Sequence, residues 1–319
     1  MQRVAILGAA GFIGTRSVEM LREDGCEVVP VVRRAMPGGV VADALDQPSL
    51  ERAFEGCDAV VAAIAGPPAT ITGVCGPIVR AAQAAGVRRI VHLSSQAVHG
   101  QSLAEGTTED SLFPSEQPFA YNSAKADAEG LMQSLTAAAH VEVVILRPGI
   151  VYGPRSRWTD GIADELLSGE AFLVRDAPGA CNAVYVDNLV HAIGVALGFG
   201  ATPEGAVFVN DAERLTWADL ILPVADALGL PARAVRRPSL AEALGPASSW
   251  TRKLRPLRKL PGLRSIAPYS REMALLQSNT VHTSNARAER LLGYRPIVSH
   301  QDAMQRSIAW LRTAGYPVR

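Results

Sequence analysis

The sequence predicts an α/β fold, a doubly wound parallel sheet followed by a smaller C-terminal α/β lobe. Strands that are apolar throughout, such as residues 59–65, alternate with helical patterns, as in a parallel sheet covered on both faces. The first strand ends in a glycine-rich turn that leads directly into a helix. The length of 319 residues is enough for two domains of ~150 residues each.

The glycine-rich turn is the first candidate site. Gly8, Gly11 and Gly14 follow the strand of residues 4–7 at three-residue spacing. A strand that turns sharply into a helix presents free N–H groups and the positive end of the helix dipole to an anion. Gly8 would allow the tight turn, Gly11 the approach of a pyrophosphate and Gly14 the packing of helix on strand. The spacing matches the usual dinucleotide fingerprint only loosely, so a purely structural turn is the alternative.

The second strand, residues 27–32, is apolar, although Pro30 is unusual in a strand. Arg33 and Arg34 follow it directly. In dinucleotide-binding folds an acidic residue at this strand end accepts from the 2′-hydroxyl of NAD, whereas arginine accommodates the 2′-phosphate of NADP. We therefore expect NADP(H) as the preferred cofactor and NAD(H) as the alternative, unless the two arginines form an ordinary solvated pair.

The next elements bring further residues to the same edge of the sheet. Helices are predicted around residues 50–54 and 78–85, and strands at residues 59–65 and 89–94. Ligands of parallel sheets bind beyond the carboxyl ends of the strands. We therefore expect Gly8, Arg33, Ala65, Ser94 and Ser95 to converge, beneath the polar loop of residues 100–118.

A helix from Tyr121 to about Ala139 follows this loop. Tyr121 and Lys125 are four residues apart, so both project from nearly the same side of the helix. Lys125 is one of only three lysines in the chain, and random placement would seldom put a lysine at this spacing. A further buried strand at residues 141–146 leads into the segment 147–154.

The remaining chain is less regular. Residues 183–188 lead into a helix, residues 207–210 resemble a strand, Thr216 caps a helix through residues 220–228, and a terminal helix runs through Trp310. The stretch from Arg252 to Arg264 is basic with interleaved leucines. It could bind a diphosphate, lie on a membrane surface beside an apolar substrate, or form a solvated helix face.

Composition argues against several other kinds of site. The 31 basic and 31 acidic residues balance, so we expect no nucleic-acid partner. The four cysteines and six histidines show no metal-ligand spacing, which predicts no metal and free thiols in the cytoplasm. We expect no transmembrane segment, because no stretch approaches ~18 consecutive apolar residues, and no signal peptide, because no cleavage site follows the first apolar run.

Taken together, these motifs resemble the extended branch of the short-chain dehydrogenase/reductase superfamily, also called the NAD-dependent epimerase/dehydratase family. The resemblance rests on residues 8–14, 94–100, 121–125, 147–154, 185–188 and 292–296, in the family's order. It implies a Rossmann-like dinucleotide-binding domain made of residues 1–154 and a returning segment at about 183–212. Residues 155–182 and 213–319 would form the substrate-binding lobe.

The resemblance assigns catalytic roles to three residues. Tyr121 would be the acid/base, Lys125 would lower the pKa of Tyr121 and bind the nicotinamide ribose, and Ser95 would hydrogen-bond the reacting oxygen. A nearby ammonium suits this chemistry, because free tyrosine, with a pKa near ~10, is too weakly acidic to exchange its proton readily at neutral pH.

The resemblance also implies a set of binding residues. Asp43 would accept from the adenine amino group, unless it is only a capping or surface carboxylate, and Pro148 would lie near the nicotinamide carboxamide. The expected cofactor-binding set is Gly8, Gly11, Phe12, Ile13, Gly14, Arg33, Arg34, Asp43, Ala44, Ala63, Ile64, Ala65, Tyr121, Lys125 and Pro148. The candidates for substrate binding are Gln96, Arg155 and Arg271.

Three departures from the family pattern narrow the expected reaction. Gln96 and Ala97 stand where the family's dehydratases carry acidic residues, so dehydration is not expected. His99 replaces a common tyrosine and is expected to pack, with a substrate contact as the alternative. Arg33 replaces the acidic residue usual in epimerases that retain NAD.

We therefore expect an oxidoreductase that uses NADPH to reduce a carbonyl group, or that oxidises an alcohol in the reverse direction. The alternatives are an epimerase of nucleotide sugars with tightly bound NAD(P), and a non-catalytic NADP-binding sensor. The resemblance further implies a homodimer formed through the helices that flank the sheet. The partner that it implies is a small-molecule substrate, either a carbonyl or alcohol compound or a nucleotide sugar.

Overall fold

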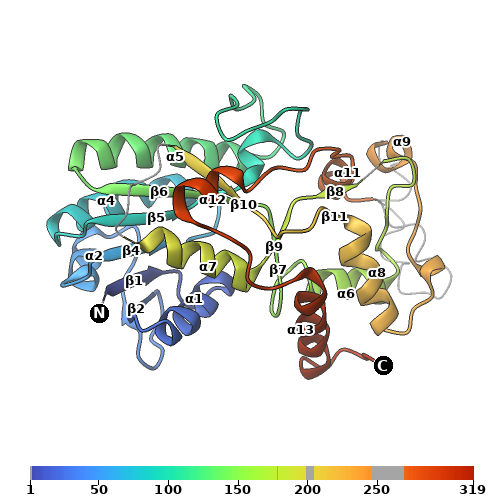
Figure 1. The fold of residues 1–319 in the computed structure, drawn as a ribbon, viewed down its shortest axis with the longest axis horizontal. Coiled ribbons are helices and arrows are strands. Elements are labelled where there is room, and N and C mark those ends of the chain that lie inside the picture. The colour runs from blue at the N-terminus through green and yellow to red at the C-terminus, as the bar shows by residue number, and fades with distance from the viewer. Residues whose placement is uncertain (1, 178, 199–204, 246–268) are drawn as a thin grey trace.

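The structure, a computed structural model, describes residues 2–177, 179–198, 205–245 and 269–319. Its larger part is a seven-stranded sheet with the order β10-β6-β5-β4-β1-β2-β3, in which every neighbouring pair is parallel. The strands are β1 (Arg3–Leu7), β2 (Glu27–Val32), β3 (Val40–Val41), β4 (Ala59–Ala62), β5 (Arg89–Leu93), β6 (Glu142–Pro148) and β10 (Ala206–Val209). The predicted doubly wound parallel sheet is therefore confirmed (Figure 1).

Helices cover both faces of this sheet because alternate strand residues point to opposite faces. Val4 and Ile6 of β1 join the core under α1 (Phe12–Glu23) and α7 (Val186–Leu197). Ala5 and Leu7 join the core on the other face. The helices on that second face are α2 (Gln47–Phe54), α3 (Pro68–Gly73), α4 (Cys75–Ala84) and α5 (Ala120–Ala139).

Pro30 lies inside β2, in register with Ile6 of β1. On its other side β2 pairs with β3, but only through Val31 and Val32. Pro30 therefore has a neighbouring strand on one side only, a place where the missing N–H donor is tolerated. The predicted strand at residues 27–32 is confirmed despite the proline.

The C-terminal part of the chain returns to this sheet. The helix α12 (Ala286–Leu292) packs on α7 and β10. The Tyr294 hydroxyl donates to the main-chain oxygen of Asn210 at 2.9 Å. The side-chain oxygen of Asn188 accepts from the N–H groups of Ile297 and Val298, both at 2.8 Å. These contacts tie residues 286–298 to the face of the sheet that α7 covers.

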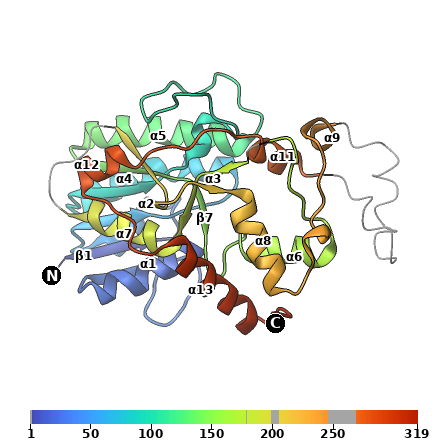
Figure 2. The ribbon, with the colours of Figure 1, turned by 45° about the vertical axis from the view of Figure 1, so that its right-hand side comes forward.

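A smaller lobe lies beyond the carboxyl ends of the strands (Figure 2). Trp217, Leu220 and Val224 of α8 are buried in its separate hydrophobic core. The basic stretch from Arg252 to Arg264, whose role was left open, lies outside the described residues. The helices of this lobe are α6 (Asp160–Ser168), α8 (Trp217–Ala227), η2 (Ala232–Ala234), α9 (Leu240–Leu244), α11 (Arg271–Gln277) and α13 (His300–Thr313).

Four short strands join the lobe to the sheet. Strand β7 (Ile150–Tyr152) pairs in parallel with β9 (Ala183–Tyr185), and β8 (Ala180–Cys181) pairs antiparallel with β11 (Leu215–Thr216). Thr216 precedes α8, and its N–H and hydroxyl both donate to the carboxylate of Asp219 at 2.7 Å. The predicted helix start at Thr216 is thus confirmed. The four short strands could not be predicted, because two or three residues are too few to show a hydrophobic period.

Candidate active site

Two glycines in the first turn of the chain, Gly8 and Gly14, lie where there is no room for a side chain. Gly8 follows β1 with a φ of +78°, and a Cβ there would lie 2.5 Å from the main-chain oxygen of Ala63. A Cβ on Gly14 would lie 2.1 Å from the main-chain oxygen of Gly8. Gly8 therefore permits the turn and the packing against the end of β4, and Gly14 permits α1 to pack on the turn.

Gly11 has a different environment. It is the N-cap of α1 with a φ of −79°, it is exposed, and a Cβ would approach only the Gly8 oxygen, at 3.1 Å. The first turn of α1 has neither a side-chain cap nor an acidic residue. The N–H groups of Phe12 and Ile13 are thus available at the positive end of the helix dipole, and the donor set fits a pyrophosphate.

The other expected cofactor residues lie at neighbouring strand ends. Arg33 and Arg34 follow β2 and are exposed, and Ala63 to Ala65 follow β4. Asp43 is also exposed, and its carboxylate accepts from the N–H of Leu45 at 3.0 Å. This contact closes a turn before α2, whose N-cap is Asp46, and it leaves the second carboxylate oxygen of Asp43 available to a ligand.

Ser95 and Tyr121 come together from different elements. Ser95 follows β5 and caps the short helix η1 (Gln96–His99), where its hydroxyl oxygen accepts from the N–H of Ala97 at 3.1 Å. Tyr121 lies in the first turn of α5. Partial burial raises the pKa of Tyr121, and a side-chain hydrogen bond with Ser95 acts in the opposite direction. The ring stays 41% exposed, so a ligand can reach it.

Lys125 lies one helical turn further along α5 and is almost completely buried. Its ammonium donates to the main-chain oxygen of Leu93 at 2.8 Å and lies 5.9 Å from the centre of the Tyr121 ring. Burial lowers the pKa of Lys125 to about 8, while Cys75 and Glu129 act to raise it. Burial has the largest effect on the pKa of Tyr121 and raises it, and the expected role of Lys125 toward that pKa stays a prediction.

A buried ion pair behind these residues was missed by the sequence analysis. Arg147 at the end of β6 forms an ion pair with Glu129 of α5, with 2.6 Å between Nη2 and Oε2. The Ser94 hydroxyl donates to the other carboxylate oxygen of Glu129. Glu129 lies four residues after Lys125, so the helical spacing that singles out Tyr121 and Lys125 could have extended to it.

His99 packs in the interior beside this pair. Its ring makes edge contacts with Phe113 and Phe208, at 5.3 and 5.6 Å between ring centres. Burial, together with the charge of Arg147, lowers the pKa of His99 to about 4. The imidazole is therefore neutral at physiological pH, and its contacts agree with the packing interpretation.

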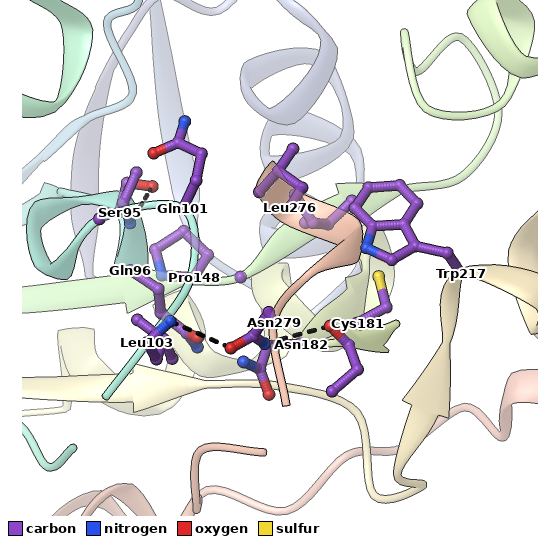
Figure 3. A pocket seen from close by; sticks show the side chains of 15 residues that line it. Ser95, Gln96, Gln101, Leu103, Pro148, Cys181, Asn182, Trp217, Leu276 and Asn279 are labelled. Carbon is purple, nitrogen blue, oxygen red and sulfur yellow. Dashed lines mark hydrogen bonds between the residues drawn. The ribbon is translucent and has the colours of Figure 1, made fainter. Parts of the chain in front are cut away.

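A small pocket, with a cavity volume of about 70 Å³, opens between the sheet and the lobe. Ser95, Gln96 and Pro148 line it from the sheet side, and Trp217 and Leu276 line it from the lobe (Figure 3). The Gln96 amide donates to the side-chain oxygen of Asn210 at 2.7 Å. It also accepts from the hydroxyl of Thr283 at 3.0 Å.

The two arginines expected at the substrate do not line this pocket. Arg155 and Arg271 are both exposed, and Arg155 adopts a φ of +70° in the turn after β7. Arg157 and Glu272, their near neighbours in sequence, are the residues whose charges act on the pKa of Tyr121. Arg157 lowers it and Glu272 raises it. The substrate-binding roles expected of Arg155 and Arg271 stay predictions.

The part of the chain that the structure describes contains no group of His, Cys, Asp or Glu side chains arranged to hold a metal. Within the same residues, no helix is both long and apolar enough to cross a bilayer.

The sequence of this chain is similar to those of known proteins. Residues 4–209 match a protein family described as the NAD dependent epimerase/dehydratase family. A 3 beta-hydroxysteroid dehydrogenase/Delta 5-->4-isomerase of Mycobacterium tuberculosis is 27% identical over 95% of this chain and 88% of its own length. A 3-diazoavenalumate denitrifying reductase of a Streptomyces species is 29% identical over 72% of this chain and 82% of its own length.

The solved structures extend the similarity in fold. A UDP-glucuronic acid 4-epimerase from Bacillus cereus, solved in complex with UDP-glucuronic acid and NAD, superposes with a TM-score of 0.74. The alignment covers 98% of this chain and 100% of the epimerase at 17% identity.

Proposed function

The chain belongs to the NAD-dependent epimerase/dehydratase family, and from that premise we propose that it catalyses the NADPH-linked reduction of a carbonyl group, or the reverse oxidation of an alcohol. The proposal is carried by the placement of Tyr121 in the first turn of α5, with Lys125 buried one turn further along and Ser95 close enough to lower the pKa of Tyr121. A hydroxyl donor, a phenol and an ammonium in this order are what proton transfer to a carbonyl oxygen requires.

The cofactor would lie over the glycine-rich turn. The N–H groups of the first turn of α1 would hold its pyrophosphate, and Gly11 leaves space for that approach. Ala63 to Ala65 would line the adjoining ribose, and Pro148, which lines the pocket, would lie near the nicotinamide. When bound, the nicotinamide supplies or accepts the hydride.

The protein's own residues would then handle the proton. Ser95 would donate a hydrogen bond to the substrate oxygen, and Tyr121 would give its proton to that oxygen as the carbonyl is reduced. The raised pKa of Tyr121 keeps the phenol protonated at neutral pH, which suits the reducing direction. Lys125, held by the Leu93 oxygen, would present its remaining N–H groups to the ribose hydroxyls.

The preference for NADPH rests on Arg33 and Arg34. Both are exposed at the end of β2, where the adenosine ribose of a dinucleotide is bound in this fold. A guanidinium pairs readily with a phosphate dianion through charge-assisted hydrogen bonds.

Dehydration is disfavoured by Gln96. The position after Ser95 holds a neutral amide already bonded to Asn210 and Thr283, not a carboxylate that could exchange a proton. The proposed enzyme therefore stops at hydride and proton transfer.

We also propose a cytoplasmic homodimer formed through the helices that flank the sheet. The proposed substrate lobe consists of residues 155–182 and 213–319, apart from residues 286–298, which pack on the sheet. Cys26, Cys57, Cys75 and Cys181 are all free thiols, in agreement with a reducing compartment.

The test is a turnover assay with the purified full chain. NADPH or NADH is mixed with a panel of aldehydes and ketones, and loss of reduced cofactor is followed by absorbance. Consumption of NADPH with formation of the alcohol supports the proposal. Isomerised nucleotide sugar with no net change in cofactor would support the epimerase alternative, and cofactor binding without any turnover would support the sensor.

A further inference from the structure

The described residues that line the pocket carry no formal charge. Among the described residues that line it, Leu103, Pro148, Ile150, Ala180 and Leu276 provide apolar surface, and none is Lys, Arg, Asp or Glu. An uncompensated charge is costly to bury in such surroundings. The pocket therefore favours an uncharged molecule over one that carries a diphosphate.

Two amide side chains of the lining, Asn182 and Asn279, are already paired within the protein. Asn279 accepts from the N–H of Leu103 at 3.1 Å and donates to the oxygen of Ala180 at 3.1 Å. Asn182 donates to the oxygen of Val281 and accepts from the N–H of Thr283, both at 3.0 Å. These amides build the wall and hold it in place, so they have little hydrogen-bonding capacity left for a ligand.

Trp217 is different, because its indole N–H has no hydrogen-bond partner within the part of the chain that the structure describes. The side chain is 1% exposed, and its Nε1 atom is buried. Figure 3 shows the nitrogen on the edge of the ring that is turned toward Leu276 and the middle of the pocket. The ring of Trp217 also contacts the ring of Trp158, at 5.4 Å between centres. Leaving such a donor unpaired costs about 1–3 kcal/mol, so a native structure seldom does so without reason.

We infer that Trp217 determines substrate specificity by donating its indole N–H to an oxygen of an uncharged substrate, at the end of the pocket away from Ser95. This inference rests on the proposed function, which places the reacting carbonyl at Ser95. In Figure 3 Ser95 and Trp217 lie on opposite sides of the pocket. The substrate class is therefore a neutral, mainly apolar carbonyl compound with a second oxygen acceptor remote from the reacting carbon.

Matched ketones test this acceptor directly. 4-Chromanone and 1-tetralone differ only in a ring oxygen that replaces a methylene, and 1,4-cyclohexanedione and cyclohexanone differ only in a second carbonyl. The expected result is that the wild-type protein prefers the oxygen-bearing member of at least one pair by about tenfold, which corresponds to ~1.4 kcal/mol. Trp217→Phe should lose that preference, since it keeps the ring and removes the N–H. The ratio between the two proteins cancels the intrinsic reactivity of each ketone.

Trp310→Phe is the matched control. The indole of Trp310 donates to the carboxylate of Asp160 at 3.0 Å, outside the pocket, so its replacement should leave the preference intact. The anion 4-oxocyclohexanecarboxylate should bind at least tenfold more weakly than 1,4-cyclohexanedione.

Nuclear magnetic resonance provides a readout that needs no turnover. In protein labelled with nitrogen-15 tryptophan, the indole signal of Trp217 should move on titration with the oxygen-bearing ketone and stay in place with its methylene counterpart. Trp217→Phe assigns the signal. If that variant does not fold, Phe variants of the other three tryptophans assign it by elimination.

The outcomes separate this inference from the proposed function. A moving Trp217 signal without any NADPH consumption refutes the proposed function and supports the specificity role. Equal binding of both members of each pair, a preference that survives in Trp217→Phe, or tighter binding of the anion overturns the role of Trp217, whatever the turnover assay gives.

Discussion

The ammonium of Lys125 donates a hydrogen bond to the main-chain oxygen of Leu93 at 2.8 Å. This bond joins the first part of α5 to the last residue of β5, and so fixes the helix that carries Tyr121 against the strand that carries Ser95. The same bond holds a cation in a buried place, and burial lowers the pKa of Lys125 to about 8. Positioning of the site therefore has a measurable cost in stability.

Replacing Lys125 with Met should stabilise the protein at pH 7. A pKa lowered from 10.5 to about 8 corresponds to about 3 kcal/mol, less about 1 kcal/mol for the lost hydrogen bond. Between pH 8 and 10.5 the unfolded chain binds more protons than the native protein at this residue, so native stability rises with pH in that window. Denaturant unfolding should show a flatter pH dependence in Lys125→Met. The exposed control Arg52→Met should retain the wild-type slope, and an unchanged slope in both would contradict the lowered pKa.

Replacing Tyr121 with Phe should reduce kcat by at least about 10²-fold and leave the dissociation constant of NADPH unchanged. The variant keeps the ring and removes the proton that is transferred. Because the pKa of Tyr121 is raised, the wild-type rate of alcohol oxidation should increase steadily into the alkaline range, since this direction needs the phenolate. Steady-state kinetics and a cofactor titration check both expectations. Tyr316→Phe, which removes a surface hydroxyl bonded to Asp164, should behave as wild type.

Gly14→Ala should destabilise the fold, whereas Gly11→Ala should weaken cofactor binding. The Cβ of Gly14→Ala would clash with the Gly8 backbone, so the thermal midpoint should fall markedly. Gly11 has an ordinary φ and only one tight neighbour, at 3.1 Å, so Gly11→Ala should fold but bind NADPH at least tenfold more weakly. Thermal unfolding and a cofactor titration distinguish the two effects. Undiminished cofactor binding by a folded Gly11→Ala protein would remove the pyrophosphate from this turn.

Replacing Arg33 with Gln should raise KM for NADPH about tenfold or more and leave KM for NADH unchanged. A charge-assisted hydrogen bond to a phosphate contributes about 1.5–3 kcal/mol, and NADH lacks that phosphate. Arg52→Gln on α2 removes an exposed arginine outside the expected site and should change neither value. Arg34→Gln, measured in parallel, apportions the effect. Equal changes for both cofactors would show that Arg33 does not recognise the 2′-phosphate.

Removing one partner of the buried Glu129–Arg147 pair should destabilise the fold. Glu129→Gln leaves the Arg147 guanidinium uncompensated in the interior, at a cost of about 3–5 kcal/mol. Glu289→Gln breaks the exposed pair with Arg295 and should change stability by less than ~1 kcal/mol. Chemical denaturation measures both. Similar small losses in the two variants would mean that the buried pair is compensated by other groups.

Sequence patterns predicted the parts of this protein that depend on local order. The glycine turn, the apolar strands and the helix from Tyr121 each have a period or spacing that can be recognised in the sequence alone. Glu129 and Arg147 meet across 18 residues, and Trp217 reaches the pocket of Ser95 from the other lobe. Such contacts depend on how elements pack, so no local pattern reports them.

The return of residues 286–298 to the sheet constrains how this protein can change over evolutionary time. Strand β10 and the helices α7 and α12 all come from the half of the chain that also builds the substrate lobe. Recombination near residue 154 would therefore exchange β10 and the helices α7 and α12 together with the lobe. The helices of the incoming half would then have to pack on a sheet from another protein. New specificities in this architecture should arise from point substitutions around the pocket rather than from exchange of whole lobes between genes.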